Sequence, residues 1–271
     1  MQGLLYARPF WYDWRYMVSW AIRRQAMFLL IAGLIGLAIF AVFFGDALYT
    51  APSCSDGTRN QSEAGIDCGG PCAVLCEAQV QDLSTLWSRS FPGAQGAYDV
   101  VALIENTNTA AGVEDVAYSF KLYDVENILI AEREGRTFVN PHEVFAIYER
   151  SVATGDRVPT RTFLTLTRLS PWTTEVPPKP DLRITDRQFD MNSGSPRLRA
   201  VIVNASIFEV EDVVITAIIY DESGNAAAVS KTEVPRLRKD ERKDIAFIFP
   251  RTLPTTPARI DMLARVKAIG S

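Results

Sequence analysis

The sequence predicts a mostly β-sheet protein, in which two tandem antiparallel β-sandwiches follow one N-terminal membrane helix and a small disulfide-rich segment. Three observations carry this prediction. Residues 27–45 form an unbroken apolar run, all four cysteines lie between residues 54 and 76, and the rest of the chain repeats itself. With 48% hydrophobic and 22% charged residues, the composition is that of a globular protein and excludes a fully disordered chain.

The apolar run, residues 27–45, reads MFLLIAGLIGLAIFAVFFG and contains no charged side chain. As a helix these 19 residues would span about 28 Å, close to the roughly 30 Å hydrocarbon core of a bilayer. The alternative is a cleaved signal peptide, whose apolar core is usually shorter and ends at a site of small residues. Because this run ends in Phe43, Phe44 and Gly45, we expect an uncleaved single-pass anchor.

The segment before the helix, residues 1–26, is basic and aromatic, whereas the first basic residue after the helix is Arg59. The positive-inside rule therefore places the N-terminus in the cytoplasm and all residues after Asp46 outside it. Aromatic and basic side chains favour the headgroup level, so the lipid bilayer is the expected partner of Trp11, Trp14, Tyr16, Trp20, Arg23 and Arg24. A docking helix for another membrane protein is the alternative interpretation.

Residues 46–77 are expected to form a disulfide-stapled segment, because they hold every cysteine and many turn residues but few apolar ones for a core. Outside the cytoplasm, an even number of clustered cysteines indicates disulfides. We therefore expect two disulfides among Cys54, Cys68, Cys72 and Cys76, with three pairings open. A zinc site is the less favoured alternative, because exported thiols oxidise and C-x3-C spacing is looser than the usual C-x2-C.

The same stretch matches the pattern CxDGxxNxxExGxDCGGxC and resembles a short cysteine-rich repeat of secreted and surface proteins. That resemblance implies a module and no activity. Four of its side chains carry oxygen atoms of the type that calcium prefers: Asp56, Asn60, Glu63 and Asp67. Their spacing is not that of an EF-hand loop, and such side chains also shape turns by hydrogen bonding to the backbone. The turn-shaping role is the simpler interpretation, so the sequence predicts no cofactor, with calcium as the alternative.

Residues 78–170 and 182–271 are two copies of one domain, as shown by matches at a nearly constant offset. Val113–Val116 recurs letter for letter as Val210–Val213. Apolar residues alternate along Val116–Leu122, and turn residues follow at short intervals. This pattern predicts an antiparallel sandwich of about seven strands in each copy.

The segment Phe120-Lys121-Leu122-Tyr123-Asp124 resembles the signature of the FxLYD domain, an Ig-like β-sandwich of bacterial and archaeal exported proteins. In the second copy Ala217 and Ile219 replace the Phe and the Leu, while Tyr220-Asp221 remain. The resemblance implies an Ig-like fold and export. It implies no active site, since the family is known by its fold.

The connector between the copies, residues 171–181, contains Pro171, Pro177, Pro178 and Pro180. Closely spaced prolines favour a polyproline-II spacer. We therefore expect the connector to hold the two sandwiches apart, with Trp172 packing onto the first.

Charge and motifs argue against several functions. A net charge of −4 and an isoelectric point near 5.2 argue against a nucleic-acid partner. The single histidine, His142, excludes sites that need two histidines, and no nucleotide-binding or nucleophile motif follows a strand. A basic run at an expected hairpin tip could bind an anionic partner, although a solvated loop is the simpler interpretation: Arg236, Arg238, Lys239, Arg242 and Lys243.

These features together predict a single-pass cell-membrane protein that is not an enzyme and that acts outside the cytoplasm. It would bind or scaffold a protein partner in the envelope or outside the cell. One alternative is an accessory subunit of an envelope complex, such as a secretion or pilus assembly, that docks through its aromatic N-terminus. A more remote alternative is an enzyme with an unrecognised carboxylate site.

Overall fold

The computed structural model of the chain describes residues 20–48, 53–60, 62–93, 96–177, 179–191, 195–249, 253 and 257–267. Contacts divide the chain into two compact units, Met1–Ser53 and Cys54–Ser271, which are described separately. The expected interfacial residues Trp11, Trp14 and Tyr16 lie outside the described residues.

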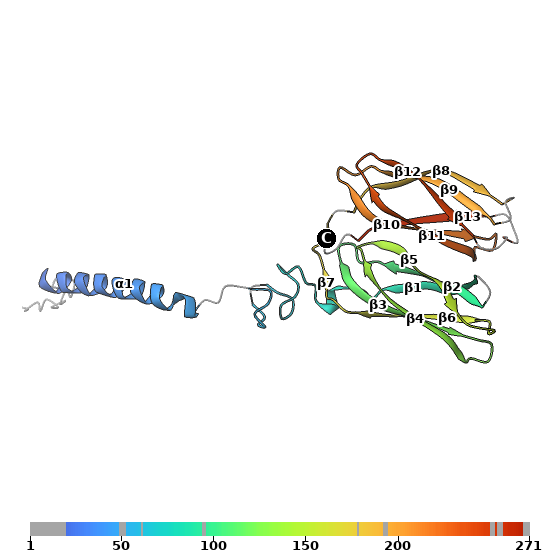
Figure 1. Cartoon of the computed structure of the whole chain (residues 1–271). Coiled ribbons are helices and arrows are strands. Elements are labelled where there is room, and N and C mark those ends of the chain that lie inside the picture. The colour runs from blue at the N-terminus through green and yellow to red at the C-terminus, as the bar shows by residue number, and fades with distance from the viewer. Residues whose placement is uncertain are drawn as a thin grey trace, which may run out of the picture. The chain divides into compact units, whose positions relative to one another are not determined.

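The first unit contains the helix α1 (Trp20–Leu48), which appears in Figure 1. Its residues from Trp20 to Phe44 have a mean hydropathy of 2.8, and their side chains are exposed on all sides of the helix. Such a helix has no polar face for water, and its length suffices to cross a bilayer. Near its start the guanidinium of Arg24 lies 5.1 Å from the centre of the Trp20 ring, within cation–π range. The structure thus confirms the predicted apolar N-terminal helix.

The second unit begins with the cysteine-rich segment (residues 54–76) and a 3-10 turn, η2 (Glu77–Gln79). The first module follows. Its strands are β1 (Ser84–Pro92), β2 (Ala97–Asn106), β3 (Gly112–Tyr123), β4 (Leu129–Val139), β5 (Glu143–Ala153), β6 (Arg161–Arg168) and β7 (Trp172–Thr173). They form the antiparallel sheets β1-β2-β5 and β4-β3-β6, and β7 pairs with β3.

The second module has the same order of elements. Its strands are β8 (Leu182–Asp190), β9 (Arg197–Asn204), β10 (Val210–Tyr220), β11 (Ala226–Leu237), β12 (Arg242–Ile248) and β13 (Arg259–Arg265). They form the antiparallel sheets β8-β9-β12 and β11-β10-β13, so β8 to β13 match β1 to β6 one for one. Tyr123 and Tyr220 end β3 and β10, at equivalent places. Within the described residues, the second module has six strands rather than the seven expected.

A buried asparagine braces the same loop in both modules. Asn106 Nδ2 donates to the carbonyl oxygens of Ala111 and Asn140, each at 2.8 Å. Asn204 Nδ2 donates likewise to the carbonyls of Phe208 at 2.8 Å and Leu237 at 3.0 Å. Burial leaves no water to satisfy these backbone groups, so the amide takes its place. The two modules therefore share these asparagine hydrogen bonds as well as the apolar pattern.

Each module has its own apolar core between its two sheets. In β3, side chains alternate as predicted, and Val116, Phe120 and Leu122 are at most 1% exposed. In β10 the equivalent row includes Ala217 and Ile219, also at most 1% exposed. Every second residue of a strand faces the same side, which is why the alternation places these residues in the core.

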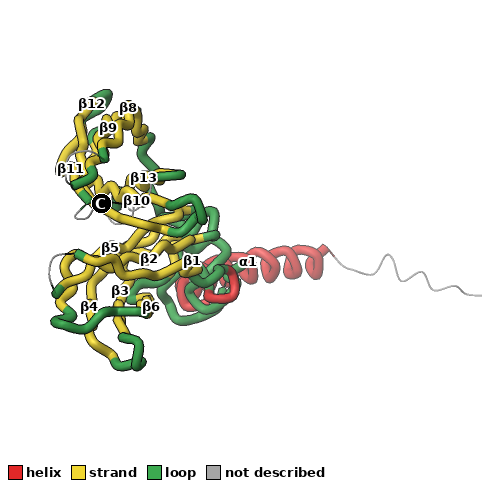
Figure 2. The backbone as a smooth tube through the Cα atoms, turned by 90° about the vertical axis from the view of Figure 1, so that its right-hand side faces the viewer, coloured by secondary structure: helices red, strands yellow, loops and turns green. Residues whose placement is uncertain are grey.

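The two modules pack face to face, which differs from the separated arrangement that the proline-rich connector predicts. Sheet β1-β2-β5 of the first module packs against sheet β11-β10-β13 of the second, so the four sheets form four stacked layers (Figures 1 and 2). Val101 and Leu103 of β2 contact a cluster with Ile218 and Tyr220 of β10. Because these strands carry apolar residues on both faces, they bury one face in their own module and the other against the partner module. The expectation that the connector holds the two sandwiches apart is therefore wrong.

A buried ion pair joins the modules beside this apolar contact. Arg265, which ends β13, has 9% of its surface exposed, and Glu143, which begins β5, has 4%. Arg265 Nε donates to Glu143 Oε2 at 3.3 Å and Nη1 donates to Thr137 Oγ1 at 2.8 Å. The guanidinium also donates to the carbonyl of Phe138 and lies 3.9 Å from the centre of the Phe145 ring. Desolvation lowers the pKa of Arg265, and Glu143 opposes that effect.

The start of the predicted connector belongs to the first module. Trp172 and Thr173 form β7, and Trp172 packs in the first core with 4% of its surface exposed, as expected. Pairing of Val113 with Trp172 continues the sheet beyond β6. The segment that links the two modules is therefore shorter than the predicted connector, residues 171–181, because the connector's start belongs to β7.

Candidate functional site

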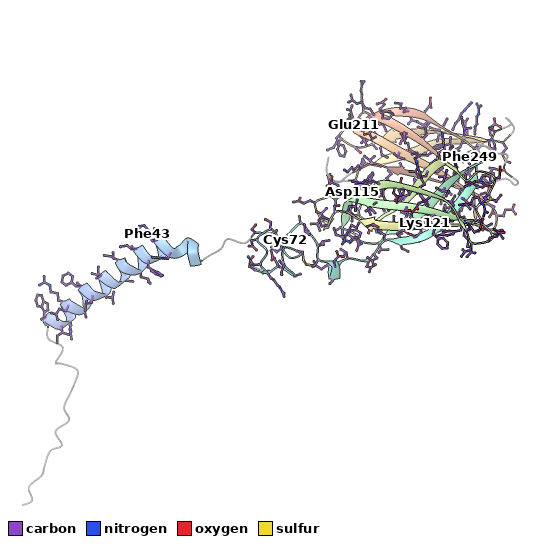
Figure 3. All side chains as sticks on the ribbon, turned by 60° about the horizontal axis from the view of Figure 1, so that its bottom comes forward. Phe43, Cys72, Asp115, Lys121, Glu211 and Phe249 are labelled. Atoms are coloured by element: carbon purple, nitrogen blue, oxygen red, sulfur yellow. A yellow bond between two sulfur atoms is a disulfide. The ribbon has the colours of Figure 1, made fainter. Side chains whose placement is uncertain are left out.

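The cysteine-rich segment is held by two disulfides, Cys54–Cys72 and Cys68–Cys76. Their pairing is interleaved, a choice that the sequence left open, and no free cysteine remains. Cys72, labelled in Figure 3, is only 4% exposed although the segment has no core of its own. Because all four sulfurs are in disulfides, no thiolate is left to bind zinc in this state.

The four candidate calcium ligands form a network of turn-shaping hydrogen bonds. Both carboxylate oxygens of Asp67 accept from the backbone, with Asp56 N at 3.0 Å and Gly57 N at 3.0 Å from one oxygen each. Asp56 accepts from Thr58 N at 2.8 Å and from Asn60 Nδ2 at 2.8 Å. These bonds are those by which Asp and Asn side chains shape turns.

Glu63 is the most buried of the four, with 5% of its surface exposed. Its Oε2 accepts weakly from Asn60 N at 3.3 Å, and its Oε1 lies 3.3 Å from Cys72 Sγ, which carries no proton in a disulfide. Among the described residues, the one close group of candidate metal ligands is Glu63 with Cys54 and Cys72, whose sulfurs are oxidised. Calcium binding therefore stays a prediction, and the geometry favours the turn-shaping role.

The cysteine-rich segment attaches to the first module through an isolated β-bridge. Val74 pairs with Thr173 of β7, on the side of β7 that faces away from β3. Leu75 N donates to the carbonyl of Trp172 at 2.9 Å, and Thr174 N donates to that of Ala73 at 2.9 Å. Leu75 also packs against the first core. The segment thus extends sheet β4-β3-β6 at its outer edge.

The basic run surrounds the turn between β11 and β12. These strands lie in different sheets, so the turn crosses from one sheet to the other and is not the tip of a hairpin, as the sequence suggested. Arg236 forms ion pairs with Glu209 and Glu211, and Arg242 pairs with Asp186. In the described part of the chain, Arg238, Lys239 and Lys243 form no ion pair. Local carboxylates therefore neutralise part of the predicted patch.

Among the residues that the structure describes, the polar groups lining the cavities do not form a recognisable catalytic set. Tyr148 donates to Asp99 Oδ2 at 2.6 Å, and Asp99 Oδ1 accepts from Ser151 N at 2.9 Å. Burial, together with this hydrogen bond to Asp99, raises the pKa of Tyr148 to about 12. The phenol stays protonated at neutral pH and cannot act as a general base. His142 lies in the turn before β5, where its backbone N–H donates to Asn108.

Comparisons with known proteins assign no family. No family model matches the chain, and no curated protein matches it significantly. Among solved structures, a transglutaminase from red sea bream aligns with 68% of this chain at 12% identity and a TM-score of 0.22. The alignment spans 29% of that enzyme's length. A similarity this weak says nothing about function.

Proposed function

We propose that this chain is a membrane-anchored protein whose modules lie outside the cytoplasm and bind or scaffold another protein. The observation that carries the proposal is a fully exposed apolar helix, α1, followed within a few residues by a segment with two disulfides. Disulfides persist in oxidising compartments and are rare in the cytoplasm. A chain with both features therefore fits export with retention in the membrane.

The charges around α1 support an orientation with the N-terminus in the cytoplasm. Arg23 and Arg24 stand in the first turns of the helix, and the next basic residue is Arg59. Basic residues near a membrane helix are retained on the cytoplasmic side. Trp20 stands beside Arg24 at this end, as a residue at the headgroup level would.

The strand order supports an Ig-like sandwich of the FxLYD type in each module. Two antiparallel sheets pack face to face, with the first, second and fifth strands in one sheet and the third, fourth and sixth in the other. Ig-like sandwiches divide their strands between two sheets in a comparable way and commonly present binding surfaces. This supports a binding role over catalysis.

Cysteine accessibility tests the proposal in intact cells. Lys239→Cys places a thiol in an exposed turn of the second module, and Gln2→Cys places one before α1. A membrane-impermeant maleimide should label Lys239→Cys and leave Gln2→Cys unlabelled until the membrane is permeabilised. Labelling in the reverse pattern, or a mature protein that has lost its N-terminal residues, would overturn the anchored orientation. Mass spectrometry of the purified chain should also show two disulfides.

A further inference from the structure

We propose that the second module accepts an extended segment of another protein at the free edge of β13, and that this segment alternates apolar with acidic side chains. The inference names a partner for the binding role above and rests on that role. Its physical basis is the open side of the second module, together with a β-bridge that another segment forms beside β7 of the first module.

The second module is open along one side. Within the described chain, β8 pairs only with β9, and β13 pairs only with β10. In the first module the equivalent strands, β1 and β6, pack against each other, whereas a cavity separates β8 from β13. The two modules share a strand order, but this side is closed in the first module and open in the second.

The cavity between β8 and β13 exposes part of the second core. Its apolar lining includes Leu182 and Ile184 from β8 and Met262 and Ala264 from β13, and Glu143 of the first module also lines it. The four apolar side chains pack against the core and yet are only partly buried. The apolar surface left open here is small, so a partner would bind mainly through backbone hydrogen bonds along the edge and through charge.

The first module shows what can occupy such an edge. There the cysteine-rich segment adds Val74 to the outer side of β7 through two backbone hydrogen bonds, both of 2.9 Å. Leu75 covers part of the first core, and Glu77 forms an ion pair with Arg168 at the end of β6. A short extended segment with an apolar residue and a nearby acid thus already pairs beside β7 of this fold.

Of the two free edges, β13 is the better acceptor. β8 is interrupted by a bulge between Thr185 and Gln188, where Asp186 has a φ of 51°. Bulges protect edge strands from pairing with other chains. The seven residues of β13 pair with β10 without a break, so its outer edge is regular and suits β-augmentation.

The charge around the opening selects an acidic partner. Lys179 and Arg187 line the cavity, where the one acid, Glu143, is already paired with Arg265. Arg197 and Arg199 line a second hollow between β8, β9 and β13. Lys179, Arg187, Arg197 and Arg199 form no ion pair with the described residues, and Asp190 is the acid that lines the second hollow. An unpaired basic rim attracts acidic side chains and disfavours basic ones.

Peptide binding to the full-length chain in detergent micelles tests the inference. The probe is a fluorescent peptide of about eight residues, a usual strand length, that alternates valine with glutamate. Fluorescence anisotropy should show saturable binding. A peptide with lysine in place of glutamate should bind more weakly, and so should one whose backbone amides are N-methylated. Hydrogen exchange of β13 should slow when the probe binds, while exchange of the edge strand β4 should not change.

Charge reversal at the opening separates this edge from other surfaces. The double change Lys179→Glu with Arg187→Glu should weaken binding of the glutamate peptide by about fivefold, the size expected for exposed charge pairs. Arg161→Glu alters an equally exposed arginine at the start of β6 and should leave binding unchanged. This comparison requires no change to the apolar core.

Three results would overturn the inference. The first is equal binding of the glutamate and lysine peptides, or no binding of either. The second is exchange protection on strands other than β13. The third is self-association of the chain that protects β13 without any peptide, because the occupant would then be a second copy. Any of these results, obtained while Lys239→Cys still reacts with impermeant maleimide, would leave the anchored orientation intact.

Discussion

The two modules share one strand order but differ in the side-chain contacts between their two sheets. In the first, Tyr118 reaches across the core and donates to Glu149 Oε1 at 2.5 Å, and Glu149 also pairs with Arg133. In the second, the equivalent places hold the fully apolar Ile215 and Phe247. The first module therefore links its sheets through charged and phenolic side chains at these places, where the second has apolar packing. The second module still has polar links between its sheets elsewhere, from Asn204 to Leu237 and from Ser230 to Ile248.

The edges of the modules differ in a parallel way. The cysteine-rich segment forms a β-bridge beside β7, whereas β13 has no such neighbour among the residues described. The difference follows from what precedes each copy: a stapled segment before the first and a short connector before the second. Duplicating a domain therefore copies its topology but not its surroundings, and the copies can take different roles.

The strongest challenge to this comparison is a polar change in the first core, Leu122→Asp. Leu122 is 0% exposed, so the variant buries a carboxylate without a partner, at a cost of about 5 kcal/mol or more. Because the modules share a buried contact, we expect both to lose stability together in thermal unfolding followed by circular dichroism. If the second module keeps its own unchanged transition, the modules are independent.

Removing one half of the buried ion pair should have the next largest effect. Arg265→Ala leaves Glu143 buried and unpaired, which typically costs about 3–5 kcal/mol. The double variant Arg265→Met with Glu143→Leu removes both charges and should recover most of the loss. Chemical denaturation measures both effects, and an Arg265→Ala variant as stable as wild type would contradict the role of this pair in joining the modules.

Gly135 tests the polar link inside the first module. A Cβ atom built on Gly135 would lie 2.2 Å from the hydroxyl oxygen of Tyr118. We therefore expect Gly135→Ala to cost about 1–3 kcal/mol, as overpacking usually does, and Tyr118→Leu to relieve it. The matched change in the second module, Thr232→Ala, faces Ile215 and should have a smaller effect on the denaturation midpoint. Equal shifts of the denaturation midpoint for the two variants would contradict the proposed difference between the two cores.

Alkaline pH should weaken the contact between the modules. Tyr148 lies in the shared cluster, and burial raises its pKa from 10.0 to about 12. The folded chain holds this proton more tightly, so the stability it contributes is complete below pH 10 and is lost as pH rises to about 12. Allowing for solvent screening, we expect a loss of about 1 kcal/mol that is absent in Tyr148→Phe. Tyr123→Phe, outside the cluster, should keep the wild-type dependence in denaturation at several pH values.

Local patterns in the sequence predicted the elements of the fold. Alternation from Val116 to Leu122 placed the core of β3, and the shared Val-Glu-Asp-Val segment placed the second copy. The packing of the modules could also have been predicted. The run Val100–Ile104 is continuously apolar, which indicates a strand covered on both faces, and it outweighs the prolines of the connector.

Other features could not be predicted from the sequence, because they depend on residues far apart in the chain. The pairing Cys54–Cys72 is one of three that the spacing allows. Arg265 and Glu143 meet across 122 residues, and neither lies in a motif. The open edge of β13 gives no signal in the sequence, because it depends on which described strands pair with β13 and which do not.

The disulfides of the cysteine-rich segment also limit how far this part of the chain can stretch. The bridge Cys54–Cys72 closes a span of 18 residues, which would otherwise extend by about 60 Å under tension. A force that pulls on the chain at Cys54 passes directly through the sulfurs to Cys72 and on to the strand beside β7. The segment therefore resists extension, and reduction of its disulfides would allow the span between Cys54 and Cys72 to lengthen under force.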